Sequence, residues 1–507
     1  MTISLRALLQ NVDDVMTSSY PDIELSEMTL DSREVSEGYV FVALKGTNEH
    51  GLKYAVAAEQ SGAVAVLWDH DETVKVPKLS IPLIAIKDLP ASLGGIAARL
   101  YDHSGQPLQI VGITGTDGKT SVSHFLAQAM NASGESCGVI GTLGIGDPAA
   151  LEKATHTTPD VISVHKNLQR LSTRGSRCVA MEVSSHALDQ QRVAAVKFDV
   201  AVLSNLTRDH LDYHGTVEAY ADAKARLFLD CQPKAAVLNL NDDFGVSIAQ
   251  ALQKTGVAVY GYASGDPKDY DQNVLLASNA KFDHQGLSAE IAFRGETHHL
   301  KAGVLGGFNL SNLLAATGAL VALGNSVEEA LAMVSKISTV PGRIEKVEYS
   351  TAHGFSQDFL AVVDYAHTPG ALESVLTALR AHCIGRLICV FGCGGDRDKG
   401  KRPVMAAVAE RLADVVVVTD DNPRYEDPKQ IMQDILAGFD QPDFVKIEHD
   451  RAAAINKTIA IAETGDVVLI AGKGHEQAQL VQGRELPFDD RKQITAALAQ
   501  LAERAVA

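Results

Sequence analysis

The 507-residue chain has few of the features that mark exported or membrane-bound proteins. Its six cysteines are scattered, with no CxxC pair and no zinc-ligand spacing. Most of them lie in apolar, strand-like runs, which favours a reduced, cytoplasmic protein. No apolar run reaches the about 18 residues that suggest a membrane span. The start, MTISLRALLQNVDDVM, contains acidic residues and is not typical of a signal peptide.

Positive charge is also scarce. The chain has 45 Lys and Arg against 63 Asp and Glu, a formal net charge of -18. This balance argues against a nucleic-acid partner, which would require a basic face. An acidic surface mainly favours solubility, so an anionic substrate would need local basic residues. The absence of short-period repeats and low-complexity tracts gives a structural role no support.

What the sequence does contain predicts an α/β protein with parallel sheets. From residue 106, short apolar runs such as LQIVGI and RCVAMEV alternate with polar turns and helical segments, as parallel strands and their crossovers do. STVPGR (338–343) indicates a linker, after which the same rhythm restarts. We therefore expect a smaller N-terminal block, a central doubly wound domain and a Rossmann-like C-terminal domain. The predicted boundaries are 1–105, 106–338 and 339–507.

The stretch VGITGTDGKTSVSHF (111–125) ends like a phosphate-binding loop, with Gly118, Lys119 and Thr120. The strict pattern has a glycine where Ile113 stands, which indicates a variant loop. Backbone amides that open onto a helix N-terminus attract phosphate. Lys119 would then reach the terminal phosphates of ATP, and Thr120 a magnesium ion. The alternative is a glycine-rich turn with a surface lysine; the strand before it and the helix after it favour the phosphate site.

Polar residues follow several of the predicted central strands. Ligands of open parallel sheets bind beyond the carboxyl ends of the strands. Glu182 and Ser184 follow one strand and His210 another, and carboxylate oxygens suit magnesium. Alternatively, Glu182 is a helix-terminal carboxylate and His210 a capping or surface histidine. Lys224 lies in AYADAKARLF (219–228), where spacing alone predicts a solvated lysine.

The C-terminal block has a polar rim of its own. FGCGGDRDKG (391–400) fails the dinucleotide fingerprint because Arg397 occupies the third glycine position. An arginine at a strand end fits carboxylate recognition better. DDNPRYEDP (420–428) places carboxylates beside Arg424 on a turn held by Pro423, a mixture that suits a zwitterionic ligand. The alternative is a helix-capping turn.

Taken in order, the motifs GTDGKT, EVSSHALDQQR, SNLTRDHLDYHG, GGFNLSN, PGR, DYAHTP, FGCGGDRDKGKRP, DNPR and GKGHE cover nearly the whole chain. In this set the chain resembles the Mur ligases of bacterial peptidoglycan synthesis. The resemblance implies a monomeric ATP-dependent ligase that uses magnesium. ATP would phosphorylate the γ-carboxylate of D-glutamate in UDP-MurNAc-L-Ala-D-Glu, and an amine would attack the acyl phosphate. DNPR resembles the members that add meso-diaminopimelate.

The resemblance also implies roles for single residues of this sequence. The implied catalytic residues are Lys119, Glu182, His210 and Lys224. The implied magnesium ligands are Thr120, Glu182, His210 and Lys224, with Lys224 carbamylated by carbon dioxide to N6-carboxylysine. The implied ATP-binding residues are Gly115, Thr116, Asp117, Gly118, Lys119, Thr120, Ser121, Asn309, Arg343 and Asp364.

Two further sets carry over from the resemblance. One would hold the UDP-MurNAc-dipeptide in the N-terminal and central domains: Leu30, Ser32, Thr47, Asn48, His156, Thr157, Thr158, Ser184, Gln190 and Arg192. The other would hold diaminopimelate in the C-terminal domain: Arg397, Asp421, Asn422, Pro423, Arg424, Gly472 and Glu476. Arg424 would pair with the distal carboxylate of diaminopimelate, which lysine lacks.

This chain departs from its relatives at Asp117 and His156, where asparagine is frequent. A carboxylate beside phosphates would weaken ATP binding unless a cation or a hydrogen bond offsets it. Three alternatives remain at this point. They are the same ligation with L-lysine, a folate-polyglutamate ligase with a similar loop, and a nucleotide-dependent binding or regulatory module without catalysis.

Overall fold

The computed structural model describes residues 2–12, 20–46, 49–102, 108–265, 273–349 and 357–506. The chain forms two compact units, Met1–Tyr262 with Gly318–Asn325 and Ala263–Thr317 with Ser326–Ala507. The predicted α/β class with parallel sheets is confirmed. The predicted boundaries at 105/106 and 338/339 stay predictions.

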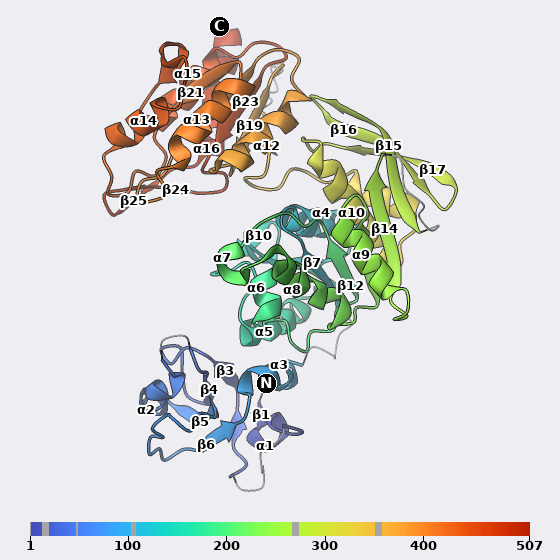
Figure 1. The fold of residues 1–507 in the computed structure, drawn as a ribbon, viewed down its shortest axis with the longest axis vertical. Coiled ribbons are helices and arrows are strands. Elements are labelled where there is room, and N and C mark those ends of the chain that lie inside the picture. Colours follow the sequence, from blue (N-terminus) through green and yellow to red (C-terminus); the bar gives the residue numbers. More distant parts are fainter. Residues whose placement is uncertain are drawn as a thin grey trace. The chain divides into compact units, whose positions relative to one another are not determined.

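The first unit begins with a four-stranded parallel sheet in the order β3-β4-β5-β6 (Figure 1). Alternate residues of a strand point to opposite faces. Val40 and Val42 accordingly pack in one core, with helix α3, and Phe41 and Ala43 in another, with helix α2. The elements are β1 (Ile3–Ser4), α1 (Leu5–Leu8), β2 (Glu24–Leu25), β3 (Glu27–Thr29), β4 (Tyr39–Ala43), η2 (Gly51–Tyr54), α2 (Ala55–Gln60), β5 (Ala63–Asp69), β6 (Leu83–Ile86) and α3 (Leu89–Leu100).

A second sheet in the first unit runs in the order β10-β9-β8-β11-β7-β12-β13-β14. From β8 to β14 its strands are parallel. The chain leaves β7 toward β8 and later continues from β12 in the other direction. The topological switch point, where ligands of such sheets bind, therefore lies between β7 and β12. The strands are β7 (Gln109–Thr114), β8 (Cys137–Gly141), β9 (Gly144–Asp147), β10 (Ala150–Glu152), β11 (Cys178–Glu182), β12 (Val200–Leu203), β13 (Ala235–Asn239) and β14 (Ala258–Ser264).

The helices between these strands start at side-chain caps where the sequence provides them. Asp160 accepts hydrogen bonds from the amides at the start of α5, and Thr216 accepts one from Ala219 at the start of α8. At α4 a glycine, Gly118, stands in the cap position instead. The helices are α4 (Lys119–Ala132), α5 (Val161–Thr173), α6 (Ser185–Asp189), α7 (Leu211–His214), α8 (Val217–Leu229) and α9 (Asp243–Leu252).

The second unit contains an antiparallel meander, β15-β16-β17, and a sheet in the order β18-β19-β23-β20-β21-β22. In the latter, β19, β23, β20, β21 and β22 are parallel. The meander and its neighbours are β15 (Val274–Asp283), β16 (Gly286–Phe293), β17 (Glu296–Ala302), α10 (Phe308–Ala322) and α11 (Val327–Val334).

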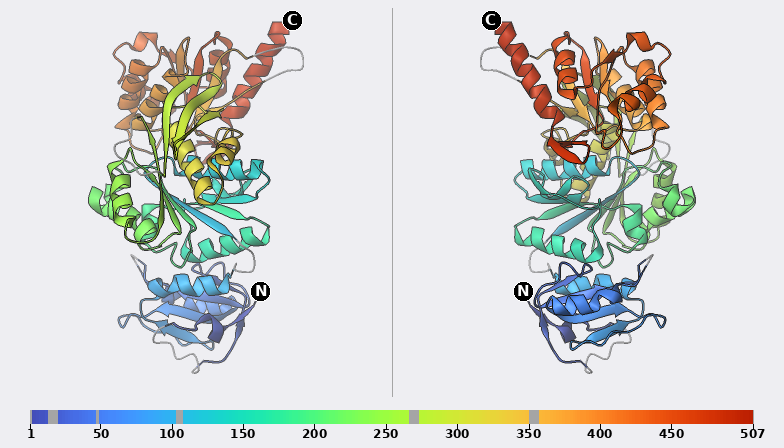
Figure 2. Two further views of the ribbon diagram at one scale, coloured as in Figure 1. Left: turned by 90° about the vertical axis from the view of Figure 1, so that its right-hand side faces the viewer. Right: turned by 90° about the vertical axis from the view of Figure 1, so that its left-hand side faces the viewer.

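Helices cover both faces of the six-stranded sheet (Figure 2). Leu387, Cys389 and Phe391 pack toward α12–α14, whereas Ile388 and Val390 pack toward α15 and α16. The elements are β18 (Glu345–Lys346), β19 (Leu360–Asp364), α12 (Pro369–Arg380), β20 (Leu387–Phe391), α13 (Lys401–Leu412), β21 (Val415–Val418), α14 (Pro428–Leu436), η3 (Pro442–Phe444), β22 (Lys446–Ile447), α15 (Arg451–Ala460), β23 (Val467–Ala471), β24 (Ala478–Val481), β25 (Arg484–Pro487) and α16 (Asp490–Val506).

All six cysteines are free thiols. Within the described part of the chain, no helix has the length and apolar character that crossing a membrane requires.

Candidate active site

The predicted phosphate loop connects the end of β7 to the start of α4. Gly115 and Gly118 have φ values of 146° and 83°, in the region that favours glycine. A Cβ on Gly115 would also lie 1.9 Å from the Ser204 hydroxyl, so the loop closely approaches its neighbour. Lys119 Nζ donates to the carbonyls of Gly115 and Thr116, at 2.9 Å each. To reach a phosphate, the ammonium must exchange these carbonyls for phosphate oxygens.

The loop after β12 holds the phosphate loop from the other side of the switch point. Thr116 N donates to the Asn205 carbonyl at 3.0 Å, and Asp117 N donates to Asn205 Oδ1 at 2.9 Å. Ser204 Oγ donates to the Asp117 carbonyl at 2.5 Å. These hydrogen bonds therefore fix the backbone of Asp117, and Asp117 is exposed to solvent. Sequence reasoning missed Ser204, although its place directly after a buried apolar run was a signal.

Glu182, at the end of β11, is buried against the start of α4. Its carboxylate accepts hydrogen bonds from Thr120 Oγ1 at 3.0 Å, from Thr142 N at 2.9 Å and from Thr142 Oγ1 at 3.0 Å. A Cβ on Gly141 would lie 2.2 Å from Glu182 Oε1, so this glycine makes room for the carboxylate. Thr142 was not predicted. It follows the carboxyl end of β8, and a single hydroxyl at a strand end is too common to predict a functional residue.

The predicted magnesium ligands come together only in part. Thr120 and Glu182 are in contact. A hydroxyl beside a carboxylate suits magnesium, whose remaining ligands are usually waters and substrate phosphates. His210 lies on another loop, with φ 52°, and its ring contacts His186 at 4.9 Å between centroids. Among the described residues, no group of three or more His, Cys, Asp or Glu side chains could hold a metal ion. The geometry therefore fits a magnesium ion that relies on phosphate oxygens.

Lys224, on α8, is buried, with 1% of its surface exposed. The solvated lysine that spacing alone predicted is therefore wrong. Its Nζ donates to the Gly115 carbonyl at 2.7 Å and lies 4.5 Å from the centre of the Tyr220 ring. Burial, and then repulsion from Lys119, lowers the pKa of Lys224 to about 6. At neutral pH this side chain is mainly an uncharged amine that touches the phosphate loop.

An aromatic cluster between α6, α7 and α8 lies next to Lys224 and was missed from the sequence. Tyr220 OH is 3.1 Å from Thr116 Oγ1, and its ring is 5.3 Å from the His214 ring. Burial raises the pKa of Tyr220 to about 12 and lowers the pKa values of His186 and His214. The histidines in DHLDYH were visible in the sequence, but nothing there distinguished His214 from a surface residue.

Several residues predicted to hold the UDP-linked substrate meet just beyond β11. Thr158 Oγ1 donates to the Glu182 carbonyl at 2.8 Å and accepts from Ser184 N at 3.1 Å. Arg192 Nη1 donates to the Thr158 carbonyl at 2.9 Å, and Arg192 Nε donates to Gln190 Oε1 at 3.0 Å. This group is thus preassembled beside the carboxylate at the phosphate loop.

The remaining substrate residues are more dispersed. Thr157 Oγ1 lies 3.1 Å from Thr142 Oγ1, and His156 is exposed, with Thr155 as its hydrogen-bond partner. Leu30 lines a cavity of about 470 Å³ beside the start of α5. Ser32 does not line this cavity. Thr47 and Asn48 lie outside the described residues.

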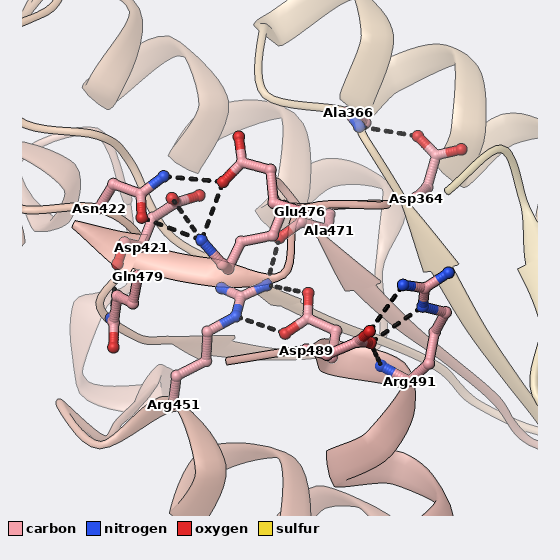
Figure 3. A network of polar contacts seen from close by, with 12 residues as sticks. Asp364, Ala366, Asp421, Asn422, Arg451, Ala471, Glu476, Gln479, Asp489 and Arg491 are labelled. Carbon is pink, nitrogen blue, oxygen red and sulfur yellow. Dashed lines mark hydrogen bonds and ion pairs between the residues drawn. The ribbon is translucent and has the colours of Figure 1, made fainter. Parts of the chain in front are cut away.

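The predicted nucleotide contacts of the second unit have internal partners. Asn309 Nδ2 donates to the Leu305 carbonyl at 2.7 Å, at the start of α10. Asp364 accepts from Ile344 N at 2.7 Å and from Ala366 N at 2.8 Å, and burial raises the pKa of its carboxyl (Figure 3). Arg343 lies over the Tyr365 ring at 5.7 Å. Asp364 thereby joins the PGRI turn to the end of β19.

The residues predicted for diaminopimelate converge at the carboxyl ends of β21 and β23. Asn422 Nδ2 donates to Glu476 Oε2 at 2.9 Å (Figure 3), and a Cβ on Gly472 would lie 2.6 Å from Asp421 Oδ2. Arg424 has φ 52°, and its Nη1 donates to the Gly395 carbonyl at 3.0 Å. The structure thus brings carboxylates and this guanidinium to one sheet edge.

The loop after β20 lies close to the same rim. A Cβ on Gly394 would meet both Arg397 Cγ and Arg424 Nη1 at 3.8 Å. Pro423 belongs to the Arg424 turn, and its carbonyl lies 2.0 Å from where a Cβ on Gly395 would be, so that glycine permits the close packing of the two loops. Lys473, inside the GKGHE motif, is fully buried among these residues and was not predicted.

Comparison with known proteins places three family models along the chain. The Mur ligase family, catalytic domain, matches residues 24–101; the Mur ligase middle domain matches 113–320; and the Mur ligase, glutamate ligase domain, matches 342–474. A diaminopimelate ligase of Ectopseudomonas mendocina (strain ymp), named UDP-N-acetylmuramoyl-L-alanyl-D-glutamate--2,6-diaminopimelate ligase, is 47% identical over 96% of this chain and 98% of its own length. The protein of the same name from Pseudomonas aeruginosa (strain PAO1) is 47% identical over 94% and 96%.

Solved structures give the same picture. A structure titled as a UDP-N-acetylmuramoyl-L-alanyl-D-glutamate--2,6-diaminopimelate ligase has a TM-score of 0.75 and 34% identity, covering 99% of this chain and 100% of that chain. A folylpolyglutamate synthase of Mycobacterium tuberculosis complexed with ADP has a TM-score of 0.56 at 16% identity, covering 82% and 94%. The latter likeness concerns the fold alone.

Proposed function

The chain belongs to the Mur ligase family, and on this premise we propose that it joins meso-diaminopimelate to UDP-MurNAc-L-Ala-D-Glu. The reaction is an ATP-dependent amide synthesis that releases ADP and phosphate, in the assembly of peptidoglycan precursors. The observation that carries the choice of amino acid is that Asp421, Arg424 and Glu476 all follow the carboxyl ends of β21 and β23, at one edge of the same sheet. A diamino acid with two carboxylates needs such a mixture of charges.

The phosphate loop binds and orients ATP. Its amides and the N-terminus of α4 attract the phosphates, and Lys119 exchanges its carbonyl partners for the terminal phosphate. Phosphoryl transfer depends mainly on positioning and charge neutralisation. Thr120 and Glu182 would hold magnesium, with His210 and Lys224 as the further ligands we propose. Magnesium, when bound, neutralises charge that develops on the transferred phosphate.

Lys224 is suited to become a carbamate. Its lowered pKa, about 6, leaves the amine uncharged at neutral pH, and only that form attacks carbon dioxide. A bond forms between Nζ and the carbon, an electron pair moves onto one oxygen, and one amine proton leaves to solvent. The product is an anion beside the Lys119 ammonium, in place of an uncharged amine. This exchange supplies a carboxylate at the phosphate loop.

The amide forms in two steps that balance chemically. The γ-carboxylate of D-glutamate attacks the terminal phosphorus of ATP, and ADP leaves. The amine of diaminopimelate then attacks the acyl carbon, loses a proton, and phosphate leaves from the tetrahedral intermediate. Ser184, Gln190 and Arg192 would hold the dipeptide end of the substrate, because they lie preassembled beside Glu182.

Arg424 would give selectivity against lysine. A guanidinium that forms two parallel hydrogen bonds with a carboxylate recognises the distal end of diaminopimelate, which lysine lacks. The uridine-side TLDSR and the DNPR motif oppose a folate-polyglutamate ligase. A binding module without catalysis would not need a buried, uncharged lysine against the phosphate loop. We further propose that the enzyme works in the cytoplasm as a monomer.

The test is phosphate release by the purified protein with ATP, magnesium and UDP-MurNAc-L-Ala-D-Glu. Meso-diaminopimelate and L-lysine are compared as the added amine, and a reaction without amine is the control. We expect release with diaminopimelate and not with lysine. Release with lysine alone would keep the ligase and overturn the role of Arg424, and release with neither would overturn the proposed reaction.

A further inference from the structure

Lys473 follows β23 and is fully buried. A lysine is rarely buried to this extent unless its ammonium group is paired. Its ammonium donates to Asn422 Oδ1 and to Glu476 Oε2, at 2.9 Å each, and lies 4.0 Å from Asp421 Oδ1. Burying a charge is expensive unless it is paired and hydrogen-bonded. Here the cation and its partners satisfy one another in the interior of the predicted diaminopimelate rim.

Asn422 extends this contact to a third segment. Its Oδ1 accepts from Lys473 Nζ and also from Leu480 N at 2.9 Å, while its Nδ2 donates to Glu476 Oε2. Gln479 Nε2 donates to the Asp421 carbonyl at 2.6 Å. The turn after β21, the loop after β23 and the β24–β25 hairpin therefore meet at one polar centre (Figure 3).

The same hairpin holds Arg424 in an uncommon backbone conformation. Arg424 N donates to the Leu480 carbonyl at 2.9 Å, and Gln482 N donates to the Arg424 carbonyl at 2.6 Å. A residue other than glycine at φ 52° is uncommon and needs surrounding contacts to hold it there. The direction of the Arg424 guanidinium thus depends on a hairpin that the Lys473 centre fixes in place.

Side-chain exposure separates the roles within this group. Asn422 is buried, with its amide oxygen and nitrogen both engaged in the centre. The Glu476 side chain is one third exposed and uses Oε2 for both inner contacts. Glu476 and Arg424 are therefore accessible to a ligand, whereas Lys473 and Asn422 are buried and support them through hydrogen bonds.

We propose that Lys473 is a positioning residue for diaminopimelate. Its ammonium fixes Glu476 directly and Arg424 through Asn422 and the β24–β25 hairpin. The inference rests on the proposed function, because it assumes that diaminopimelate binds at this rim. Removing the ammonium leaves Asn422 Oδ1 and Glu476 Oε2 without this donor, so the three segments should shift and recognition should weaken.

The experiment measures KM and kcat for each substrate in Lys473→Met, with Lys457→Met as the matched control. Lys457 is an exposed lysine of the same sheet domain that pairs with Glu448. We expect the KM for diaminopimelate to rise about tenfold or more, as when a hydrogen bond to a charged group is lost. The KM values for ATP and the UDP-linked substrate should stay within about twofold. Lys473→Arg should restore part of the affinity, since it returns the charge.

A double-mutant cycle with Arg424→Ala separates positioning from general damage. If Lys473 acts through Arg424, the KM increases of the single variants will be far from multiplicative. Multiplicative increases, or an equal loss for all three substrates, would overturn the proposal. If Lys473→Met does not fold, Lys473→Gln takes its place, because its neutral amide still donates a hydrogen bond. An inactive wild-type enzyme would instead overturn the proposed function.

Discussion

Lys224 in the first unit and Lys473 in the second are both buried, yet their surroundings differ in kind. Among the described residues, Lys224 donates to a single carbonyl, that of Gly115, and Lys119 is close enough to repel it. Lys473 has an amide oxygen and a carboxylate as partners and a second carboxylate at 4.0 Å. Burial beside another cation favours an uncharged, reactive amine, whereas burial in contact with anions favours a fixed cation. The first environment suits a lysine that reacts, and the second suits a lysine that holds neighbouring segments in place.

The largest expected effect comes from removing the reactive amine. Lys224→Ala should lower kcat on the order of 10²–10³-fold, as loss of one preorganised charged group does at other active sites. Formate or acetate should restore part of the rate by supplying a carboxylate. Steady-state phosphate release checks this, with Lys234→Ala as the control, since Lys234 is an exposed lysine paired with Asp199. Turnover like that of the wild type would contradict the carbamate.

Arg424→Ala tests the second unit at a residue that is proposed to contact diaminopimelate itself, whereas Lys473 is proposed only to position it. Truncating one partner of a charged pair costs about 2 kcal/mol or more, so kcat/KM for diaminopimelate should fall on the order of 30-fold or more. The KM for ATP should not change, because Arg424 is not one of the predicted nucleotide contacts. Arg411→Ala is the control, an exposed arginine that pairs with Glu373. Equal loss of ATP affinity would count against the assignment.

The pH dependence of the free energy of unfolding tests, without any substrate, whether Lys224 is uncharged in the folded protein. The folded pKa of Lys224 is about 6, below its ordinary value of 10.5, so the unfolded chain binds more protons between these limits. Wild-type stability relative to Lys224→Met should therefore decrease as pH falls from about 10 toward 6, by at most about 1.4 kcal/mol per pH unit. Urea unfolding in buffers free of carbon dioxide measures the difference. A difference that does not vary with pH would contradict the uncharged state.

The smallest expected effect concerns Asp117, where the family resemblance leads us to expect asparagine. The loop is held by the Asp117 backbone and by Ser204 and Asn205, and the residue is exposed. Asp117→Asn should therefore change the KM for ATP by less than about fivefold, since exposed charges contribute little. ATP titration of the ligase reaction measures it. A larger change would mean that the carboxylate contacts the nucleotide directly.

Local sequence patterns predicted those parts of the fold that depend on local physics. The alternation of apolar runs with helical segments predicted parallel sheets, because strands buried on both faces must be apolar throughout. The phosphate loop was recognisable from its Gly118-Lys119-Thr120 ending between a predicted strand and a predicted helix, and Gly115 and Gly118 adopt φ values that favour glycine. Glu182 was identified as a candidate from its position at a strand end.

Residues whose roles depend on tertiary contacts could not be predicted from spacing. Lys224 has the pattern of a surface lysine on its helix, and only packing against the phosphate loop shows that it is buried. Lys473 was passed over within GKGHE because two of its partners, Asn422 and Asp421, come from a turn far away in the sequence. Thr142 contacts the site through its amide and its hydroxyl, and Tyr220 through its hydroxyl, and such contacts leave no periodic signal.

The most direct test of the central claim is a competition between the two amines. The wild-type enzyme would receive ATP, magnesium and UDP-MurNAc-L-Ala-D-Glu with equal concentrations of meso-diaminopimelate and L-lysine, and mass spectrometry would identify the product. The account predicts a UDP-linked tripeptide that carries diaminopimelate, with one phosphate released per amide formed. A product that carries lysine, or ATP hydrolysis without any amide product, would contradict it.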